Sequence, residues 1–314
     1  MGSDGLLIVD KPGGITSLDV VRRAKRRLGV KKAGHVGTLD PFATGVLPVA
    51  LGEGTKLIPF LSDEPKRYEG TLKLGEETTT DDLTGEVISR KPWSGVTSEE
   101  IEEATRLFVG KILQIPPMFS AVKMAGEPLY RLARKGLDVE RKGREVHVFR
   151  FQIEEVSLPR VRFQVSCSKG TYVRALARDL GRQIGCGAHL IHLRRVQSGV
   201  FSIEAAVSWE DMNALEPENL RLAILPLEGA LPGLPEMVGD RGLVRKVRLG
   251  QGMHVRDLSS QLPPEFDRGK WIKVIAPGEG LVAILKSEVN RSDIPWAKGD
   301  SLVLRPLRVF HPKP

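Results

Sequence analysis

The sequence predicts an α+β protein in which antiparallel strands predominate. Strand and helix patterns are mixed along the chain, without the regular alternation that a doubly wound parallel sheet requires. Two strand patterns, at 146–156 and 161–168, are separated by only a few residues around Pro159, so these strands must be antiparallel. The length of 314 residues exceeds what one hydrophobic core usually serves. We therefore expect one large and one small domain.

Composition places the chain among ordinary globular proteins, with 41% hydrophobic and 27% charged residues. Apolar runs such as 6–9 and 281–285 are much shorter than the roughly 18 to 20 residues of a membrane helix. The first residues, MGSDGLLIVDKP, lack the pattern of a secretory signal. We therefore expect a cytoplasmic protein that does not contact a membrane.

The cysteines and histidines predict no metal site. Cys167 and Cys186 are too few for a disulfide framework or a four-cysteine zinc site, so we expect two buried free thiols. His189 and His192 lie three residues apart, but no cysteine or carboxylate pattern accompanies them. The net charge of +8 favours a polyanionic partner without requiring one.

The first helix is predicted after Thr16, which with Asp19 resembles a capping box, and before Gly29, a natural C-terminal stop. Apolar residues repeat along it at helical spacing: Leu18, Val21, Ala24 and Leu28. Seven cations fall within eleven residues that contain no acid: Arg22, Arg23, Lys25, Arg26, Arg27, Lys31 and Lys32. The cationic face is either a nucleic-acid contact or an ordinary solvated helix surface.

Further elements follow in order. Residues 71–74 alternate as a half-buried strand does, and a helix should run from Thr97, with Glu100 three residues later, to Val109. A basic insertion at about 117–145 contains a helical pattern from 129 to 135 that Gly136 closes. A helix is then predicted from 172 to 184 with Thr171 as its N-cap, and a strand from 192 to 196.

Prolines and glycines interrupt all periodicity near residue 230, and we place the domain boundary there. The cluster consists of Pro226, Gly229, Pro232, Gly233 and Pro235. The predicted domains are therefore 1–233 and 234–314. In the second domain, short strands at 271–275, 281–285 and 301–304 indicate a β-rich fold.

One segment, HVGTLDPFATGVLP at 35–48, contains a single carboxylate among glycines and prolines that shape the backbone. Pro41 disfavours helical dihedrals at Asp40, while Gly37 and Gly45 allow close approach of another chain. Such a loop could direct Asp40 at a ligand. Because Asp-Pro is also a common turn opener, the loop alone favours an ordinary turn.

The whole segment resembles the catalytic motif of the TruB family of pseudouridine synthases. The resemblance extends through the segments KPGG at 11–14, KRY at 66–68, QIPP at 114–117 and SKGTYVR at 168–174. It implies the pseudouridine synthase fold, with a mixed but largely antiparallel central sheet flanked by helices. By the same resemblance the basic insertion is similar to the family's thumb, and the C-terminal domain is similar to a PUA domain, a small RNA-binding β-barrel.

The resemblance also implies a function, the isomerisation of uridine 55 in the T-loop of tRNA to pseudouridine by base flipping. It assigns catalysis to Asp40, an ion pair with Asp40 to Arg174, and stacking on the target base to Tyr68. It further implies substrate-binding roles for His35, Lys11, Leu193, Thr38 and Lys169, and RNA contacts by Arg131, Arg134 and Lys135 of the insertion. From the residues alone, Arg174 could be a surface arginine, Tyr68 an ordinary strand residue and Leu193 an ordinary core residue.

This isomerisation involves neither redox change nor net hydrolysis, so no cofactor or metal is expected. The partner is tRNA, bound without a guide RNA, and the resemblance suggests a monomer. Loop bases that can be splayed and stacked are what proteins usually read in RNA, which suits a T-loop. A second hypothesis is an RNA-binding module or tRNA-folding chaperone in which catalysis is secondary or lost. Intact Asp40, Tyr68 and Arg174 argue against that loss.

Overall fold

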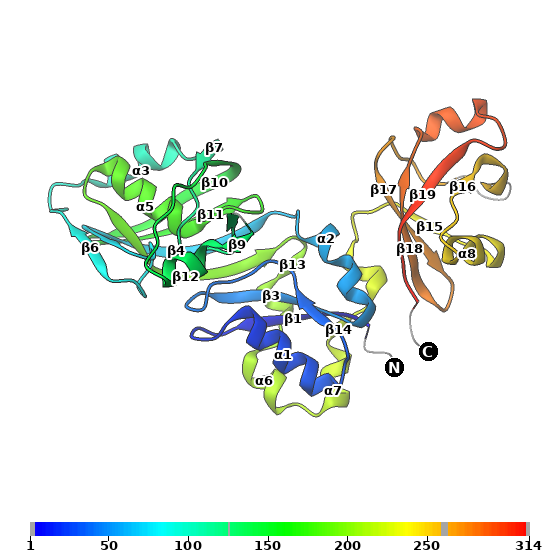
Figure 1. Ribbon diagram of the computed structural model, residues 1–314, viewed down its shortest axis with the longest axis horizontal. Coiled ribbons are helices and arrows are strands. Elements are labelled where there is room, and N and C mark those ends of the chain that lie inside the picture. Colours follow the sequence, from blue (N-terminus) through cyan, green and yellow to red (C-terminus); the bar gives the residue numbers. More distant parts are fainter. Residues whose placement is uncertain (1–3, 125, 259–262, 312–314) are drawn as a thin grey trace.

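The computed structural model describes residues 4–124, 126–258 and 263–311, which form a large sheet, a smaller C-terminal sheet and flanking helices (Figure 1). The main path of the large sheet runs in the order β14-β1-β3-β12-β4-β11-β10-β7, with β2 and β13 paired to its side. Its strands are β1 (Gly5–Lys11), β2 (Ala33–His35), β3 (Thr44–Leu51), β4 (Lys66–Leu74), β7 (Gly110–Gln114), β10 (Arg144–Ser157), β11 (Arg160–Cys167), β12 (Ala188–Ser198), β13 (Phe201–Ser202) and β14 (Ile224–Leu225). Within this sheet only β3 and β12 pair in parallel, so the expected mixed, largely antiparallel sheet is confirmed.

Two groups of helices cover this sheet. They are α1 (Ser17–Leu28), α2 (Ile58–Leu61), α3 (Ser98–Arg106), α5 (Val173–Ile184), α6 (Trp209–Ala214) and α7 (Pro217–Leu222). The helix α5 packs on β12 and on α3, while α1 packs on β2, β3, α6 and α7. One apolar cluster joins α1, α3, α5, α6 and α7 to the strands, whereas the buried residues of α2 belong to a second cluster. No helix in the described part of the chain is long and apolar enough to cross a membrane.

Local sequence signals explain how the helices begin and end. Thr16 and Asp19 form the capping box of α1, and Gly29 ends it in the left-handed conformation with φ of 66°. Thr97 and Glu100 form the same box at α3. Both capping predictions are confirmed.

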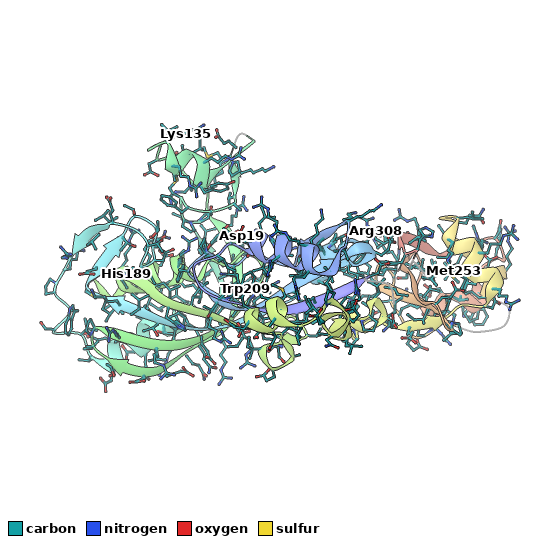
Figure 2. All side chains as sticks on the ribbon, turned by 90° about the horizontal axis from the view of Figure 1, so that it is seen from below. Asp19, Lys135, His189, Trp209, Met253 and Arg308 are labelled. Atoms are coloured by element: carbon teal, nitrogen blue, oxygen red, sulfur yellow. The ribbon has the colours of Figure 1, made fainter. Side chains whose placement is uncertain are left out.

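The thumb-like insertion projects from the body of the protein, and Lys135 lies near its tip (Figure 2). It contains the short strands β8 (Lys123–Met124) and β9 (Glu127–Pro128) and the helix α4 (Leu129–Arg134). A separate hairpin of β5 (Glu76–Thr78) and β6 (Val87–Arg90) extends beyond β4. The predicted helical pattern in the insertion is confirmed, and Gly136 has φ of 74° just after it.

The C-terminal sheet is curled and has the order β15-β17-β18-β19-β16. Its elements are β15 (Glu236–Val238), α8 (Arg241–Arg248), β16 (Met253–His254), β17 (Trp271–Ala276), β18 (Gly280–Ser287) and β19 (Leu302–Val309). The C-terminal sheet is attached to the large sheet through an apolar cluster to which both contribute. At this cluster Phe60 packs edge to face on Trp271, with 4.8 Å between the ring centroids. The Lys56 ammonium also donates to the Val309 carbonyl at 2.8 Å. The three strands predicted in this part of the chain are present.

Three local predictions are wrong. Leu18 is 48% exposed, because the buried face of α1 is formed by Val20 and Val21 rather than by Leu18. The helix predicted to reach Val109 ends at Arg106, since the next residues form turns that lead into the pairing of β7 with β10. The N-cap of α5 is Tyr172 instead of Thr171, and its side chain makes no capping bond.

Candidate active site

The candidate active site is built around Asp40, which lies on the loop between β2 and β3. The Arg174 guanidinium donates from Nε to Oδ2 at 2.8 Å and from Nη2 to Oδ1 at 3.1 Å. This bidentate geometry fixes both the distance and the orientation of the carboxylate. Arg174 is only 3% exposed, whereas 32% of the Asp40 side chain remains accessible. The pair thus presents an oriented, reachable carboxylate above a buried cation.

Arg174 is itself held by groups other than Asp40. Its Nη1 donates to the Thr80 carbonyl at 2.8 Å, and its Nη2 donates to the Phe119 carbonyl at 2.9 Å. The buried Asp82 carboxylate lies 3.4 Å from Nη1. Asp82 is fixed in turn by the Thr80 hydroxyl at 2.7 Å. The guanidinium therefore occupies one position between two carboxylates.

The loop that carries Asp40 is anchored through its backbone. Arg195 donates from Nη2 to the Gly37 carbonyl at 3.1 Å and from Nη1 to the Thr38 carbonyl at 3.4 Å. Ser17 Oγ donates to the Leu39 carbonyl at 3.0 Å and accepts from the Leu39 amide at 2.9 Å. The next two carbonyls accept from the Ala43 amide and from the Gly14 amide, respectively. Every carbonyl from 37 to 41 therefore has a donor, so the loop is held in one conformation before any substrate arrives.

Three buried cations surround this loop: Lys11, Lys66 and Arg195. Within the described chain none of them forms a salt bridge, and each donates to backbone carbonyls instead. Lys11 reaches the Pro41 carbonyl at 3.1 Å. Burial lowers the pKa of Lys11 to about 8, a shift that the Asp40 carboxylate opposes, and burial likewise lowers the pKa of Lys66 to about 8. These buried cations thus lie close to the loop that carries Asp40, and Asp40 is the carboxylate that acts most strongly on Lys11.

Tyr68 lies on β4 in register with Arg195 on β12. It is half-buried and packs against the large apolar cluster. Burial raises the pKa of the Tyr68 hydroxyl, so the ring carries no charge at neutral pH. A neutral aromatic ring beside the loop offers a stacking surface for a base.

The other residues predicted to bind substrate differ in how they contribute to the site. His35 ends β2, and burial lowers its pKa, with Arg195 adding to the effect. Among the described residues its buried Nδ1 has no hydrogen-bond partner. Thr38 enters the site through its backbone, and Leu193 lies in the core. Lys169 is exposed and pairs with Asp63, and among the described residues it forms no ion pair with Asp40.

The basic insertion is joined to the site at its base, through the contact of Arg174 with the Phe119 carbonyl. Its predicted RNA-binding residues lie on and beside α4, at a distance from this base along the chain. Lys135 pairs with Glu127 at 2.8 Å, and the Arg134 guanidinium lies 5.7 Å from the Tyr130 ring centre. Arg131 and Arg134 form no salt bridge with any described residue.

Three residues that hold the site were missed by the sequence analysis: Ser17, Asp82 and Arg195. The signal for Arg195 was present, since it stands two residues after Leu193 and so shares its strand face. An arginine at such an inward position requires internal acceptors. No comparable signal exists for Ser17 or Asp82, because their partners are distant in sequence.

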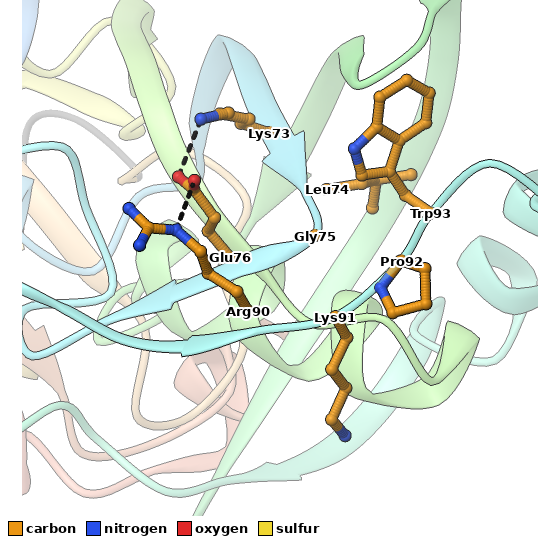
Figure 3. A pocket seen from close by; sticks show the side chains of 8 residues that line it. All are labelled: Lys73, Leu74, Gly75, Glu76, Arg90, Lys91, Pro92 and Trp93. Atoms are coloured by element: carbon orange, nitrogen blue, oxygen red, sulfur yellow. Dashed lines mark hydrogen bonds and ion pairs between the residues drawn. The ribbon is translucent and has the colours of Figure 1, made fainter.

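A shallow pocket of about 360 Å³ lies elsewhere, between the end of β4 and the strand β6 (Figure 3). Trp93 and Pro92 line one side of it, and Glu76 bridges Lys73 at 2.7 Å and Arg90 at 3.2 Å. None of the predicted site residues lines this pocket. Across the described residues, no group of three or more His, Cys, Asp or Glu side chains is arranged to hold a metal ion.

Comparisons with known proteins agree with this geometry. Residues 25–173 match the family model described as TruB family pseudouridylate synthase (N terminal domain), and residues 174–232 match that of the tRNA pseudouridylate synthase B C-terminal domain. The tRNA pseudouridine synthase B of Geobacter sulfurreducens is 43% identical over 98% of this chain and 100% of its own length. That of Geotalea uraniireducens is 55% identical over 66% of this chain and 67% of its own.

Solved structures support the same assignment. A chain in the crystal structure of a Cbf5-Nop10-Gar1 complex matches with a TM-score of 0.75 and 30% identity, over 99% of this chain and 86% of that chain. A chain of the archaeal box H/ACA sRNP Nop10-Cbf5 complex matches with a TM-score of 0.73 and 27% identity, over 99% and 87%. The protein therefore belongs to the TruB family of pseudouridine synthases and is an isomerase of that family.

Proposed function

We propose that this enzyme converts uridine 55 in the T-loop of tRNA to pseudouridine, with Asp40 as the catalytic carboxylate. The observation that carries the proposal is the bidentate Asp40–Arg174 pair on a fully anchored loop. The names of the relatives, tRNA pseudouridine synthase B, support tRNA as the substrate.

The reaction breaks the bond from uracil N1 to ribose C1′, rotates the base and forms a bond from C5 to C1′. The proton on C5 leaves, and N1 gains one, so atoms and electrons balance without an oxidant or a hydrolytic water. Asp40 serves as a nucleophile or as the ion that stabilises positive character at C1′. Arg174 orients it, and the anchored loop reduces the reorganisation needed at the moment of reaction.

Access to Asp40 requires the uridine to leave the stacked loop, which costs a few kcal/mol. We assign Tyr68 to stacking on the flipped base and His35 to the space that the base vacates. The neutral Tyr68 ring and the unpartnered Nδ1 of the half-buried His35 suit these roles. Lys11, Thr38, Leu193 and Lys169 are proposed as the remaining substrate-binding residues, with Lys11 acting through the loop.

The RNA is held by two further parts in this proposal. The thumb docks on the T-loop through Arg131, Arg134 and Lys135, and residues 234–314 form a PUA-like RNA-binding domain beside a catalytic domain at 1–233. The curled five-stranded sheet supports the second assignment. We further propose that the enzyme acts in the cytoplasm as a monomer without guide RNA.

The test is release of tritium from a tRNA transcript labelled at uracil C5, without added metal or nucleotide. We expect one tritium released per tRNA, and none from a transcript with cytidine at position 55. Asp40→Asn should bind tRNA with nearly normal affinity yet release no tritium, since an amide is neither a nucleophile nor an anion.

Each outcome decides a different part of the proposal. Turnover by Asp40→Asn would refute the catalytic role of Asp40. Release from a uridine other than position 55 would refute uridine 55 as the target nucleotide, but it would not contradict catalysis by Asp40. Tight tRNA binding with no release by the unaltered enzyme would favour an RNA-binding or tRNA-folding role.

A further inference from the structure

The exposed face of α1 carries cations that the fold itself does not use. Two of the helix arginines have structural roles, since Arg23 donates to the Asn213 side chain and Arg27 donates to the Leu215 carbonyl, which fix α6 against α1. The others point to solvent: Arg22, Lys25, Arg26, Lys31 and Lys32. Of these five, only Arg22 has an acidic neighbour in the described chain, Asp19 at 3.5 Å, and both side chains are largely exposed. We call these five residues the α1 cationic face.

Helix stability does not account for this face. Cations in the last turn of a helix complement its dipole, but one or two are enough for that purpose. Arg22 faces Lys25 and Arg26 at spacings of three and four residues, where like charges repel each other. Lys31 and Lys32 lie beyond the helix and repeat the same charge. A polyanion bound along this face would attract each of these cations and so offset the repulsion between them.

The face begins next to the candidate active site. Ser17, the first residue of α1, is hydrogen-bonded to both backbone groups of Leu39, which precedes Asp40. From there the helix runs twelve residues, or about 18 Å, away from the loop. A shallow cavity of about 450 Å³ lies near the far end of α1 and is lined by Arg22, Lys25, Arg26, Gly29 and Val30. An RNA strand leaving the site along α1 would meet several cations in succession.

The α1 face and the thumb are oriented compatibly. Figure 2 shows Asp19, at the start of α1, on the side of the body from which the thumb bearing Lys135 projects. A single RNA that reaches Asp40 can therefore contact the thumb and α1 together. Flexible cations on an exposed helix suit phosphate groups, which attract by charge and need no base-specific geometry.

We propose that the α1 cationic face binds backbone phosphates of the same tRNA whose uridine reaches Asp40. The inference rests on the proposed function, because it takes tRNA as the substrate, and it adds a second contact surface apart from the thumb. The partner is identified by its chemistry, a row of phosphates on an RNA strand continuous with the flipped nucleotide.

The test compares two triple variants of the full chain. The first, Arg22→Gln, Lys25→Gln and Arg26→Gln, removes three charges from the face. The matched control, Lys91→Gln, Arg150→Gln and Arg160→Gln, removes three exposed cations elsewhere that form no salt bridge with a described residue. Circular dichroism and thermal unfolding establish that both variants are folded. The probe is unmodified full-length tRNA transcript, with Kd measured at several KCl concentrations and turnover measured by tritium release.

For the α1 variant we expect Kd and KM to rise roughly tenfold or more near 0.1 M KCl. The slope of log Kd against log salt should fall in magnitude by about 2 to 3, because each lost phosphate contact contributes roughly 0.7 to 0.9. The control variant should change Kd and slope far less, since its cations lie off the proposed RNA path. Heparin serves as a polyanion without a flippable base, and its affinity should fall less than that of tRNA.

The outcomes separate this inference from the proposed function. Normal turnover with Kd and slope unchanged in the α1 variant would overturn the inference and leave the function standing. Equal losses in the α1 variant and the control, or equal losses for tRNA and heparin, would also overturn it, because the face would then contribute only general charge. Absence of product with the unaltered enzyme would instead reject the proposed function.

Discussion

Asp40 and Arg174 show how one buried side chain can set the orientation of another. Arg174 donates to both Asp40 oxygens and to two backbone carbonyls, so its guanidinium uses most of its donors in one fixed plane. A lysine in the same place has one compact ammonium and cannot span these acceptors. The orientation of Asp40 therefore depends on the planar, two-pronged guanidinium of Arg174 as well as on its charge.

We predict that Arg174→Lys lowers the single-turnover rate of pseudouridine formation at least 100-fold, which corresponds to about 2.7 kcal/mol of barrier. Affinity for tRNA should change little, because Arg174 is buried beneath Asp40. The free energy of unfolding should fall by about 1 to 3 kcal/mol as buried carbonyls lose their donors. Quench-flow assays and urea unfolding measure the two effects.

Arg178→Lys is the matched control. Arg178 lies one turn further along α5, is equally buried, and pairs with Asp81 at 2.9 Å and with the Ile115 carbonyl at 3.1 Å. The substitution Arg178→Lys should lower the free energy of unfolding about as much as Arg174→Lys does. The single-turnover rate should remain much closer to that of the unaltered enzyme. Equal rate losses in the two variants would show that Arg174 acts only through stability.

Lys11 makes the stability of the protein depend on pH. Its pKa is lowered to about 8 by burial, whereas the unfolded chain keeps the ordinary value of 10.5. Between these values the unfolded state binds more protons, so the contribution of Lys11 to unfolding free energy rises with pH. Below about pH 8 the burial cost is fully present.

We predict that Lys11→Met removes this rise. The unfolding free energy of the unaltered protein minus that of the variant should increase by about 1 to 2 kcal/mol from pH 7.5 to 9.5, at up to 1.36 kcal/mol per pH unit. Urea unfolding at both pH values gives the difference, and the subtraction cancels Cys167, whose raised pKa acts in the opposite direction above pH 9. If this difference in unfolding free energy stays constant or decreases with pH, the pKa of Lys11 is not lowered in the folded protein.

Among the helices, α1 lies at the surface and is also joined to the loop that carries Asp40. Thr16 caps the helix, while Ser17 beside it bonds both backbone groups of Leu39. Adjacent residues thus separate two tasks, stabilising the helix and holding the loop. The same division lets the two tasks be tested independently.

We predict that Ser17→Ala and Thr16→Ala both lower unfolding free energy by about 1 to 2 kcal/mol, through lost loop hydrogen bonds and a lost cap respectively. Only Ser17→Ala should also slow pseudouridine formation, by roughly tenfold, because it frees the Leu39 backbone next to Asp40. Single-turnover rates at saturating tRNA measure this effect. Equal rates in the two variants would mean that the loop keeps its conformation without Ser17.

At the scale of the whole molecule, the C-terminal sheet is attached through an apolar cluster that includes residues of both sheets. Phe60 of α2 belongs to this cluster, and Trp271 of β17 packs against it edge to face. The connecting chain between β14 and β15 carries five prolines and glycines that interrupt helix and strand patterns. The junction is therefore held by side-chain packing as well as by the chain.

We predict that Phe60→Ala lowers unfolding free energy by about 3 kcal/mol or more and makes residues 226–235 the first site of thermolysin cleavage under native conditions. Phe163→Ala, in the core of the large sheet, is the control with the same change of side chain. It should destabilise the protein without directing cleavage to this segment. Mass spectrometry of the early fragments distinguishes the two, and identical fragments would contradict a separable C-terminal domain.

Features that depend on neighbouring residues could be predicted from the amino-acid sequence. The capping boxes at Thr16 and Thr97, the stop at Gly29 and the hairpin of β10 and β11 are local, so their signals lie within a few residues. The motif around Asp40 likewise identified the family, because it is contiguous. Amphipathic spacing was less exact, and it placed Leu18 on the wrong face of α1.

Contacts between groups that are distant in the chain could not be predicted in this way, because they depend on the three-dimensional packing. Arg174 comes from 134 residues beyond Asp40, and Arg195 from more than 150 residues beyond the carbonyls it holds. The strand order that joins them, with β12 between β3 and β4, crosses the chain and has no local signature. The burial that lowers the pKa of Lys11 also arises from packing of the whole domain. Sequence fixes local geometry through short-range sterics and hydrogen bonds, whereas an active site is assembled by long-range packing that brings its charges together.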